Sequence, residues 1–298
     1  MKELIGMYKN GNYTVKILSD GTKIRETEED DFIPAFAENC DCTITKKCDG
    51  GCAFCYAGCT QNGKHAELLN WKFLDSLHPY TELALNGNDL SHPQLDEFLL
   101  ILKDKKVFAN MTVNQKHFEQ HYNRLMNWSK NGLIHGVGVS LVNPTDEFIS
   151  KVKAFPNTVI HTIAGILTKE NIDKLGNNNL KVLMLGYKTT NRGQNYLDSH
   201  NDEVNNNIAW LRDNLQDVLP KFNVVSFDNM AIEQLNVKRL LTDEEWEEFF
   251  MGQEAEFTFY LDLVDGTYAM NSIQDLENHR PIGDLSIDEM FENIRLRK

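Results

Sequence analysis

The chain has 298 residues, 41% of them hydrophobic, which is enough for a substantial core in one large α/β domain or two smaller ones. Its formal net charge of −14 opposes a polyanionic partner such as duplex DNA or bulk RNA, because such binding relies on Lys and Arg to neutralise phosphates. The polar start lacks the apolar core of a secretory signal, and no apolar stretch approaches the roughly 18 residues of a membrane span. We therefore expect a cytoplasmic protein with reduced thiols and no membrane partner.

The first predicted element is an N-terminal β-hairpin. Residues 12–27 alternate apolar and polar side chains around Asp20-Gly21, a dipeptide that favours a tight turn. We assign this hairpin to an extension of residues 1–37. A short strand near 41–45 then leads the chain into a cluster of cysteines.

Strand-like and helix-like segments alternate after the cysteines. The strands are predicted at 82–85, 107–112, 136–141, 158–163 and 181–185, and helices lie between them, for example at 95–103 and 118–128. This repeated order indicates parallel strands joined by right-handed crossovers. With the strand before the cysteines there are about six units. The predicted fold class is therefore α/β, a partial (β/α)6 TIM-like barrel over residues 38–195.

The C-terminal third, residues 196–298, predicts an α+β extension packed on this core. Its expected elements are a helix at 207–214, a strand at 222–227, a helix after the capping box of Thr242 and Glu245, a hairpin formed by 257–263 and 267–270, and a final helix at 287–295.

Three cysteines in the loop after the first core strand are the most specific chemical signal. Cys48, Cys52 and Cys55 are separated by three and two residues, and Phe54 and Tyr56 flank the last of them. Three thiolates from one loop can hold three corners of a four-iron cluster and leave the fourth iron open to a ligand from outside the protein. The alternative is a zinc knuckle or a group of core thiols, but no second Cys-x-x-Cys pair follows to complete a four-ligand zinc site.

This loop resembles that of the radical S-adenosylmethionine (SAM) enzymes, which have the same spacing and usually an aromatic pair at the last cysteine. The resemblance implies that Cys48, Cys52 and Cys55 bind a [4Fe-4S] cluster and that SAM chelates the open iron. The reduced cluster would cleave SAM to methionine and a 5'-deoxyadenosyl radical, which takes hydrogen from a substrate. The resemblance also implies that Tyr56 borders the adenine and that a flavodoxin or ferredoxin supplies the electron.

The end of the second core strand extends the resemblance. Many radical SAM enzymes have Gly-Gly-Glu-Pro there, followed after two residues by His-Pro, and the His-Pro pair of this chain aligns that quartet with Asn86, Gly87, Asn88 and Asp89. The family uses the quartet to hold the amino group of SAM. Here Asn88 replaces the glutamate and Asp89 the proline, and the alternative is an ordinary strand-to-helix turn.

Other candidate site residues follow the later strands. Asn114 lies where the family often has Thr-Asn-Gly, and Ser140 lies where a serine often meets the SAM carboxylate or ribose; either side chain would equally suit a cap. Lys188 and Arg192 follow the sixth strand, at the expected mouth of the barrel. They are candidate substrate contacts that would clamp a carboxylate or phosphate, with a solvated loop as the alternative.

The role of Cys40, Cys42 and Cys59 stays open at this point. The C-terminal region has no cysteine for a second cluster, so packed thiols are the simpler interpretation. The acidic surface and a C-terminal hairpin similar to cysteine-free extensions of peptide modifiers favour a peptide or small-molecule substrate. The alternatives are modification of a nucleotide or nucleic-acid base by the same radical chemistry, and a non-catalytic iron–sulfur or zinc regulator.

Overall fold

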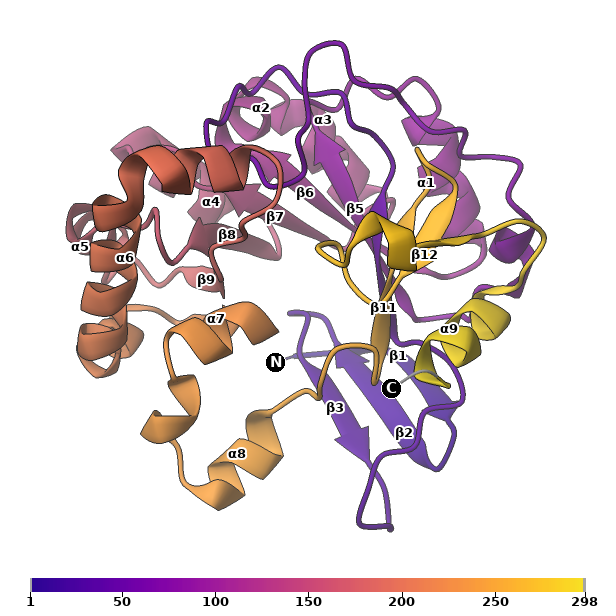
Figure 1. The fold of residues 1–298 in the computed structure, drawn as a ribbon. Helices are drawn as coiled ribbons and strands as arrows, with labels where there is room; N and C mark the ends of the chain where they lie inside the picture. Colours follow the sequence, from indigo (N-terminus) through magenta and orange to yellow (C-terminus); the bar gives the residue numbers. More distant parts are fainter. Residues whose placement is uncertain (1, 297–298) are drawn as a thin grey trace.

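A ten-stranded sheet forms the centre of the computed structural model, which describes residues 2–296 (Figure 1). The strand order is β10-β9-β8-β7-β6-β5-β4-β11-β12-β13. All neighbours from β10 to β11 are parallel, and β12 and β13 continue the sheet antiparallel. The strands are β4 (Asn39–Thr43), β5 (Glu82–Asn88), β6 (Phe108–Asn114), β7 (Gly136–Ser140), β8 (Thr158–Ile163), β9 (Lys181–Leu185), β10 (Val224–Phe227), β11 (Thr258–Asp262), β12 (Thr267–Ala269) and β13 (Arg280–Pro281).

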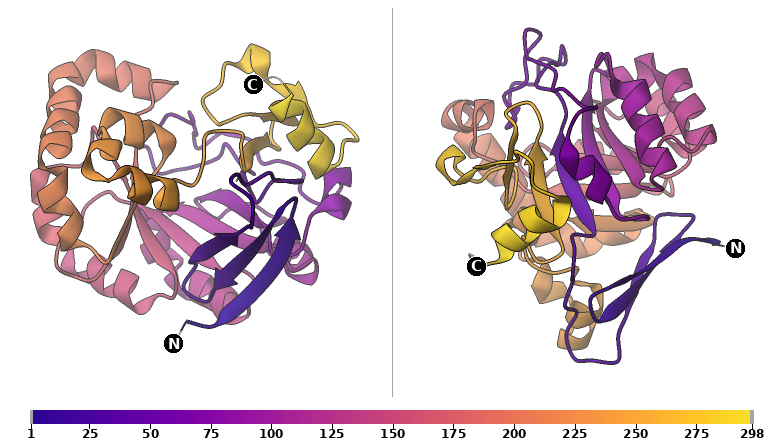
Figure 2. Two further views of the ribbon diagram at one scale, coloured as in Figure 1. Left: turned by 90° about the horizontal axis from the view of Figure 1, so that it is seen from below. Right: turned by 90° about the vertical axis from the view of Figure 1, so that its right-hand side faces the viewer.

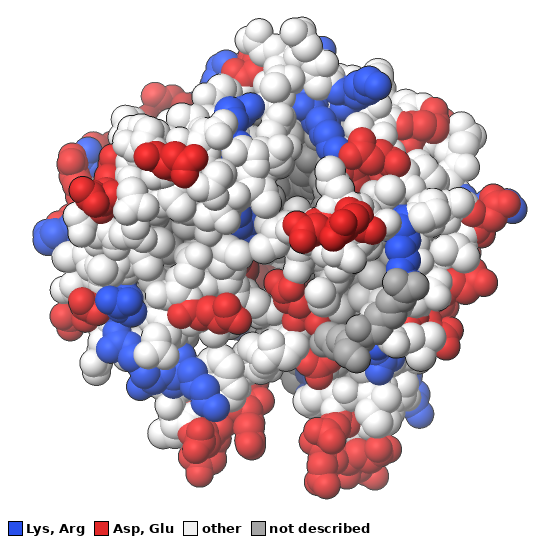
Figure 3. Space-filling model, in the orientation of Figure 1, with Lys and Arg blue, Asp and Glu red and all other residues white. Residues whose placement is uncertain are grey.

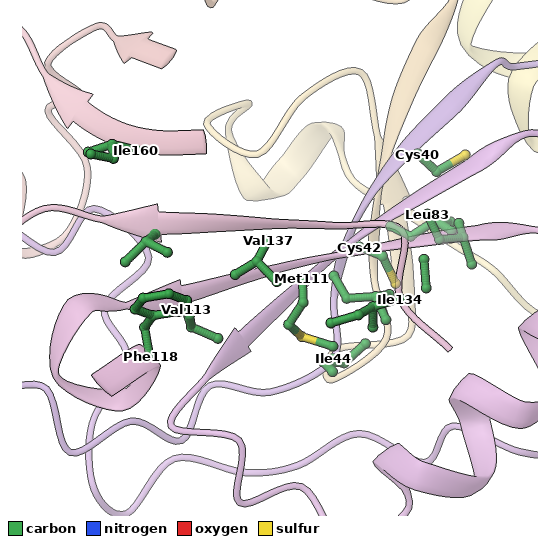
Figure 4. Packing of buried hydrophobic residues seen from close by; sticks show 14 of the residues in the cluster. Cys40, Cys42, Ile44, Leu83, Met111, Val113, Phe118, Ile134, Val137 and Ile160 are labelled. Atoms are coloured by element: carbon green, nitrogen blue, oxygen red, sulfur yellow. The ribbon is translucent and has the colours of Figure 1, made fainter. Parts of the chain in front are cut away.

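Helices cover the outer face of the curved sheet, and this confirms the predicted α/β barrel fold (Figures 1 and 2). They are α1 (Leu95–Asp104), α2 (Gln115–Gln120), α3 (Tyr122–Lys130), α4 (Asp146–Ala154), α5 (Lys169–Leu175) and α6 (Arg192–Val218). Every second strand residue is buried against them, and Figure 4 shows Met111, Val113 and Val137 packed in this layer with Phe118 of α2. This strict alternation explains why the strands could be located from the sequence.

The other alternate strand residues face the barrel interior and remain partly accessible. Asp41, Asn86, Asn114, Ser140 and His161 belong to this inner set. The interior is therefore lined largely by polar side chains. The residues nearest the carboxyl ends of the strands are the ones placed to meet a ligand, as in complete (β/α)8 barrels.

The C-terminal residues complete the sheet at both of its edges. β10 pairs with β9, while β11 returns to pair with β4 at the other edge. The predicted C-terminal hairpin is confirmed as β11 and β12, joined through Asp265 and Gly266. The remaining helices are α7 (Asn229–Gln234), α8 (Asp243–Phe249) and α9 (Ile287–Arg295), with 3-10 helices η1 (Lys72–Ser76), η2 (Leu219–Lys221), η3 (Val237–Leu240) and η4 (Leu276–Asn278).

Two helix predictions needed correction. The segment expected as one helix at 118–128 is divided into α2 and α3 at His121, whose φ of −108° and ψ of 20° are not helical. The helix expected at 207–214 is the second part of the 27-residue α6, which is kinked at His200. Both breaks are backbone features that leave the apolar spacing on either side intact.

The N-terminal extension is a three-stranded antiparallel sheet, of which the predicted hairpin is only two strands. β2 (Tyr13–Leu18) pairs with β3 (Lys23–Glu26) as expected, and β1 (Leu4–Asn10) pairs with the free edge of β2. The turn between β1 and β2 requires Gly11, because its φ is +59° and a Cβ there would lie 1.8 Å from the Ile33 carbonyl oxygen.

This small sheet lies against the amino ends of the barrel strands, at the end opposite the cysteine loop (Figure 2). Lys181, the first residue of β9, donates to the Asp20 carbonyl at 2.8 Å, and the side chain of Asn157, just before β8, donates to the Ser19 carbonyl at 3.0 Å. The N-terminal sheet therefore helps to close one end of the barrel and leaves the other for the site.

No helix within residues 2–296 combines the length and apolar character needed to cross a membrane.

Candidate iron–sulfur and SAM site

The cluster loop, residues 44–60, leaves β4 and crosses the carboxyl ends of the neighbouring strands (Figure 1). Cys48, Cys52 and Cys55 lie on it as free, half-buried cysteines. Their partial exposure leaves the cysteine side chains accessible to a cofactor, while side chains of β5, α2 and the segment after β9 hold the loop backbone.

Two asparagines of β5 fix the start of the cluster loop. Asn86 accepts from the Ile44 backbone N–H at 2.7 Å through Oδ1 and donates to the Thr45 carbonyl at 2.9 Å through Nδ2. Asn88 donates to the carbonyls of Thr45 and Lys47, both at 3.0 Å, and contacts Cys59 Sγ at 3.4 Å. The side chains predicted to orient SAM thus bind the loop itself.

Of the rest of the predicted quartet, Gly87 lies at an irregularity near the end of β5, and Asp89 begins the turn that follows the strand. Gly87 is packed so closely that a Cβ would lie 2.4 Å from Met111 Sδ. The Asp89 carboxylate accepts from the backbone N–H and hydroxyl of Ser91, at 3.1 and 2.6 Å. The assignment of the quartet as a SAM contact stays a prediction, since backbone groups of such a turn can bind a ligand whatever its side chains do.

Asn114 and Ser140 lie at the ends of neighbouring strands, β6 and β7, where they are paired residues. Asn114 caps α2 by accepting from the Lys116 N–H at 3.0 Å, and its Nδ2 lies 3.5 Å from Cys52 Sγ. Ser140 makes no side-chain hydrogen bond to another described residue. It is therefore free to bind a ligand, whereas Asn114 already links the barrel to a cluster cysteine.

Helix α2 holds the cluster loop at Asp49. The Asp49 carboxylate pairs with Nε2 of the buried His117 and lies 3.2 Å from Lys116 Nζ. The hydrogen bond from His117 is the main cause that lowers the pKa of Asp49. No sequence motif marks this contact, since it joins residues 68 positions apart.

The segment after β9 holds the middle and end of the cluster loop. Arg192 donates from Nε to the Cys52 carbonyl at 3.1 Å and from Nη2 to the Cys59 carbonyl at 2.9 Å. Thr190 and Asn191 both donate to the Tyr56 carbonyl, at 3.0 and 2.7 Å. These contacts indicate that Arg192 holds the loop, rather than binding the substrate as predicted.

Lys188 lies beside the cluster loop and faces acidic residues. Its Nζ is 4.5 Å from the centroid of the Tyr56 ring and 3.9 Å from the Asp228 carboxylate. Burial would lower the pKa of Lys188, but Tyr56, Asp228 and Asp41 outweigh burial and raise it. Lys188 therefore stays charged, and its charge is already partly balanced by the protein.

A pocket opens between the cluster loop and the carboxyl ends of β8 and β9. It is partly open to solvent and is lined by Phe54, Tyr56, Ile163, Leu185, Gly186, Tyr187 and Lys188. Its walls are aromatic and aliphatic, with one cation at the edge. Such a lining suits a flat, apolar ring system carried by a polar ligand.

The cysteine sulfurs accept hydrogen bonds of the kind that stabilise thiolate ligands. Cys48 Sγ accepts from the Gly50 N–H at 3.4 Å, in addition to the contact of Cys52 with Asn114. A hydrogen bond from the Cys59 thiol is the main cause that lowers the pKa of Cys55. Free thiols on one loop with N–H donors around them fit iron–sulfur ligation. Within residues 2–296 no three His, Cys, Asp or Glu side chains are placed to hold a single metal ion.

The other three cysteines occupy two different environments. Cys40 and Cys42 of β4 are buried in the core with Leu83 and Ile44 (Figure 4). Burial raises the pKa of both thiols. They are thus packing residues on the outer face of β4, while Cys59 is a buried neighbour of Cys55.

Comparison with known proteins identifies the fold. No protein-family model and no curated protein sequence matches the chain. The crystal structure of Streptococcus suis SuiB bound to S-adenosylmethionine is similar, with a TM-score of 0.58 and 13% sequence identity over 88% of this chain and 68% of SuiB. A second SuiB structure gives a TM-score of 0.57 and 13% identity over 87% of this chain and 66% of SuiB. SuiB is a radical SAM enzyme.

The chain has the fold of SuiB. It spans about two thirds of the length of the SuiB chains. Within this fold, the cluster loop follows β4, the first barrel strand in sequence, and the pocket lies beside it. The resemblance detected in the cysteine spacing and the similarity detected in the backbone are independent observations, because one is local sequence and the other is topology.

Proposed function

We propose that this protein is a radical SAM enzyme. The observation that carries the proposal is that three free cysteines with the family spacing lie on one loop, beside an aromatic pocket, at the carboxyl ends of the strands of a radical SAM fold. Cys48, Cys52 and Cys55 would hold a [4Fe-4S] cluster, which, when bound, supplies the electron that cleaves SAM to methionine and a 5'-deoxyadenosyl radical.

The residues of the pocket would bind and shield the nucleoside part of SAM. Phe54 and Tyr56 belong to the cluster loop, and Ile163 and Leu185 end strands β8 and β9, so an adenine between them would lie close to the cysteines. The Ser140 hydroxyl, without a protein partner in the described structure, would be available to the carboxylate or ribose. The chain's own part is thus to position SAM and exclude water.

The direct test is an assay for 5'-deoxyadenosine. The protein is reconstituted anaerobically with iron and sulfide, reduced with dithionite and given SAM, and the products are separated by chromatography. We expect 5'-deoxyadenosine from the wild type and none from a Cys52→Ala variant. A wild type that contains about four irons per chain yet neither binds nor cleaves SAM would instead support a non-catalytic iron–sulfur regulator.

Filling the pocket tests the place of SAM separately. Replacing Ile163 with Trp puts a large ring where the adenine is proposed to lie, so we expect SAM affinity to fall at least about tenfold, or 1.4 kcal/mol. Calorimetric titration of the reconstituted protein with SAM measures this. Leu100→Trp on the exposed face of α1, 51% accessible, is the control. Unchanged affinity in Ile163→Trp, with iron content also unchanged, would place SAM elsewhere.

The interior of the barrel supports a peptide or small-molecule substrate over a nucleic acid. Asp41 faces the barrel interior, where the surrounding protein raises its pKa, and Asp228 and Glu254 contribute further negative charge near Lys188. Acidic side chains also spread over the face of the molecule seen in Figure 3. Phosphate groups would be repelled here. An external flavodoxin- or ferredoxin-type electron donor completes the proposal.

A further inference from the structure

Arg192 holds the cluster loop at two separate points beside its cysteines. Its two donors reach the carbonyl of Cys52, a predicted cluster ligand, and the carbonyl of Cys59, seven residues further on. The two hydrogen bonds therefore close the part of the loop that contains Cys55. A planar guanidinium can make both bonds at once, which a single ammonium cannot do with the same geometry.

The position of Arg192 in its helix is unfavourable in itself. It is the first residue of α6, where the positive end of the helix dipole disfavours a cation. The next residue, Gly193, is packed so tightly that a Cβ would lie 2.2 Å from the Lys188 carbonyl oxygen. The turn is thus constrained to present the guanidinium to the loop.

The charge of Arg192 is not balanced by an acidic partner. Within residues 2–296, no carboxylate lies within ion-pair distance of its guanidinium, and its bonds go to neutral carbonyl groups. Reduction of a cluster held by Cys48, Cys52 and Cys55 adds one negative charge, so a nearby uncompensated cation favours the reduced state.

We propose that Arg192 is a positioning residue with two separable effects on the cluster. The two hydrogen-bond donors of its guanidinium hold the loop around the cluster, and its positive charge raises the reduction potential of the cluster. This inference rests on the proposed function only in that the chain must bind a cluster. By this inference Arg192 binds the cluster loop and is no longer a candidate substrate contact.

The test compares Arg192→Met, which removes the pair of donors and the charge, with Arg192→Lys, which removes only the pair of donors. Arg212→Met is the matched control, because Arg212 lies on the same helix, is partly exposed, and forms its ion pair with Asp213 rather than with the cluster loop. All are reconstituted anaerobically. Loss of iron to a chelator gives the retention rate, and a redox titration followed by electron paramagnetic resonance gives the midpoint potential. Neither readout requires SAM cleavage or a substrate.

We expect both Arg192 variants to lose iron about 10- to 100-fold faster than the wild type, the usual range for groups that orient metal ligands. Only Arg192→Met should also show a lower midpoint potential. Equal retention in all four proteins, or an equal shift of potential in Arg192→Lys and Arg192→Met, would overturn the inference.

A further variant keeps the test valid if Arg192→Met fails to fold. Asn191→Ala removes the bond to the Tyr56 carbonyl, which is 2.7 Å long, without changing charge. It should speed iron loss at an unchanged potential, as Arg192→Lys does, and wild-type retention in both would contradict the retaining role. A wild type that binds no cluster would refute the proposed function itself, which is a different result.

Discussion

Replacing Cys52 with alanine will abolish cluster loading while leaving the protein folded. The Cys52 side chain is half-buried on the cluster loop and contributes its sulfur only to a weak contact with Asn114 at 3.5 Å. Its loss therefore costs little packing, but it removes one of three proposed ligands and with it a corner of the cluster. Iron and sulfide content after anaerobic reconstitution, with circular dichroism for the fold, measures both effects.

Cys40→Ala provides the matched control for that experiment. The chemical change is the same, but Cys40 lies in the core, 3% exposed, on the outer face of β4. We expect it to keep its iron and to lose some thermal stability, the reverse of the Cys52 result. Full iron content in Cys52→Ala would contradict the assignment of the cluster ligands.

Replacing Glu38 with alanine will lower the free energy of unfolding by about 3–5 kcal/mol, the usual cost of removing one partner from a buried ion pair. Glu38 is 1% exposed and accepts from Arg25 Nε at 2.8 Å and Tyr13 OH at 2.6 Å, while Lys23 Nζ lies at 3.2 Å. Its loss would leave two cations with little solvent between the N-terminal sheet and β4. Urea denaturation measures the change.

The control is Glu26→Ala, which breaks the more exposed pair with Lys16 and should change stability by no more than about 1 kcal/mol. If the two variants lost equal stability, the buried charge of Glu38 would contribute no more than an exposed ion pair.

The contribution of Glu38 should also depend on pH. Burial opposes its charged form, but Lys23 and Arg25 outweigh burial and lower its pKa below the ordinary value of 4.5. A lowered pKa in the folded state stabilises the protein fully above that ordinary value, and the stabilisation is lost as the pH falls through the folded-state pKa. The difference in stability between wild type and Glu38→Ala should therefore be largest near neutral pH and shrink in acid.

What could be predicted from the sequence was local or periodic. The cysteine spacing lies within one short loop, the inner and outer residues of β5 to β9 alternate, and the capping box at Thr242 marks the start of α8. β1 was missed because a bulge between Leu4 and Gly6 interrupts its alternation and leaves Leu4 and Met7 exposed. A period of two is the signal for a strand, and β1 lacks it.

The partners of the site residues could not be predicted, because they are far apart in the chain. Asn88 and Arg192 were both selected as ligand contacts from their positions at strand ends, which the structure confirms. Their side chains bind backbone groups of the cluster loop 41 to 140 residues away. The position of a residue in the fold can be predicted from the order of the strands. Whether its side chain binds a ligand or the cluster loop depends on how that loop folds back over the strand ends.

The hydrogen bonds from β5, α2 and α6 to the cluster loop also determine whether the loop becomes ordered on folding or only on binding its cofactor. Fixing one residue of backbone costs about 1–2 kcal/mol of conformational entropy, and a loop of this length would otherwise bear that cost on receiving its cofactor. Here side chains of the barrel hold the loop backbone that carries the cysteines, so we expect the loop to be ordered before any iron arrives. The affinity for the cofactor is then reduced little by ordering the protein.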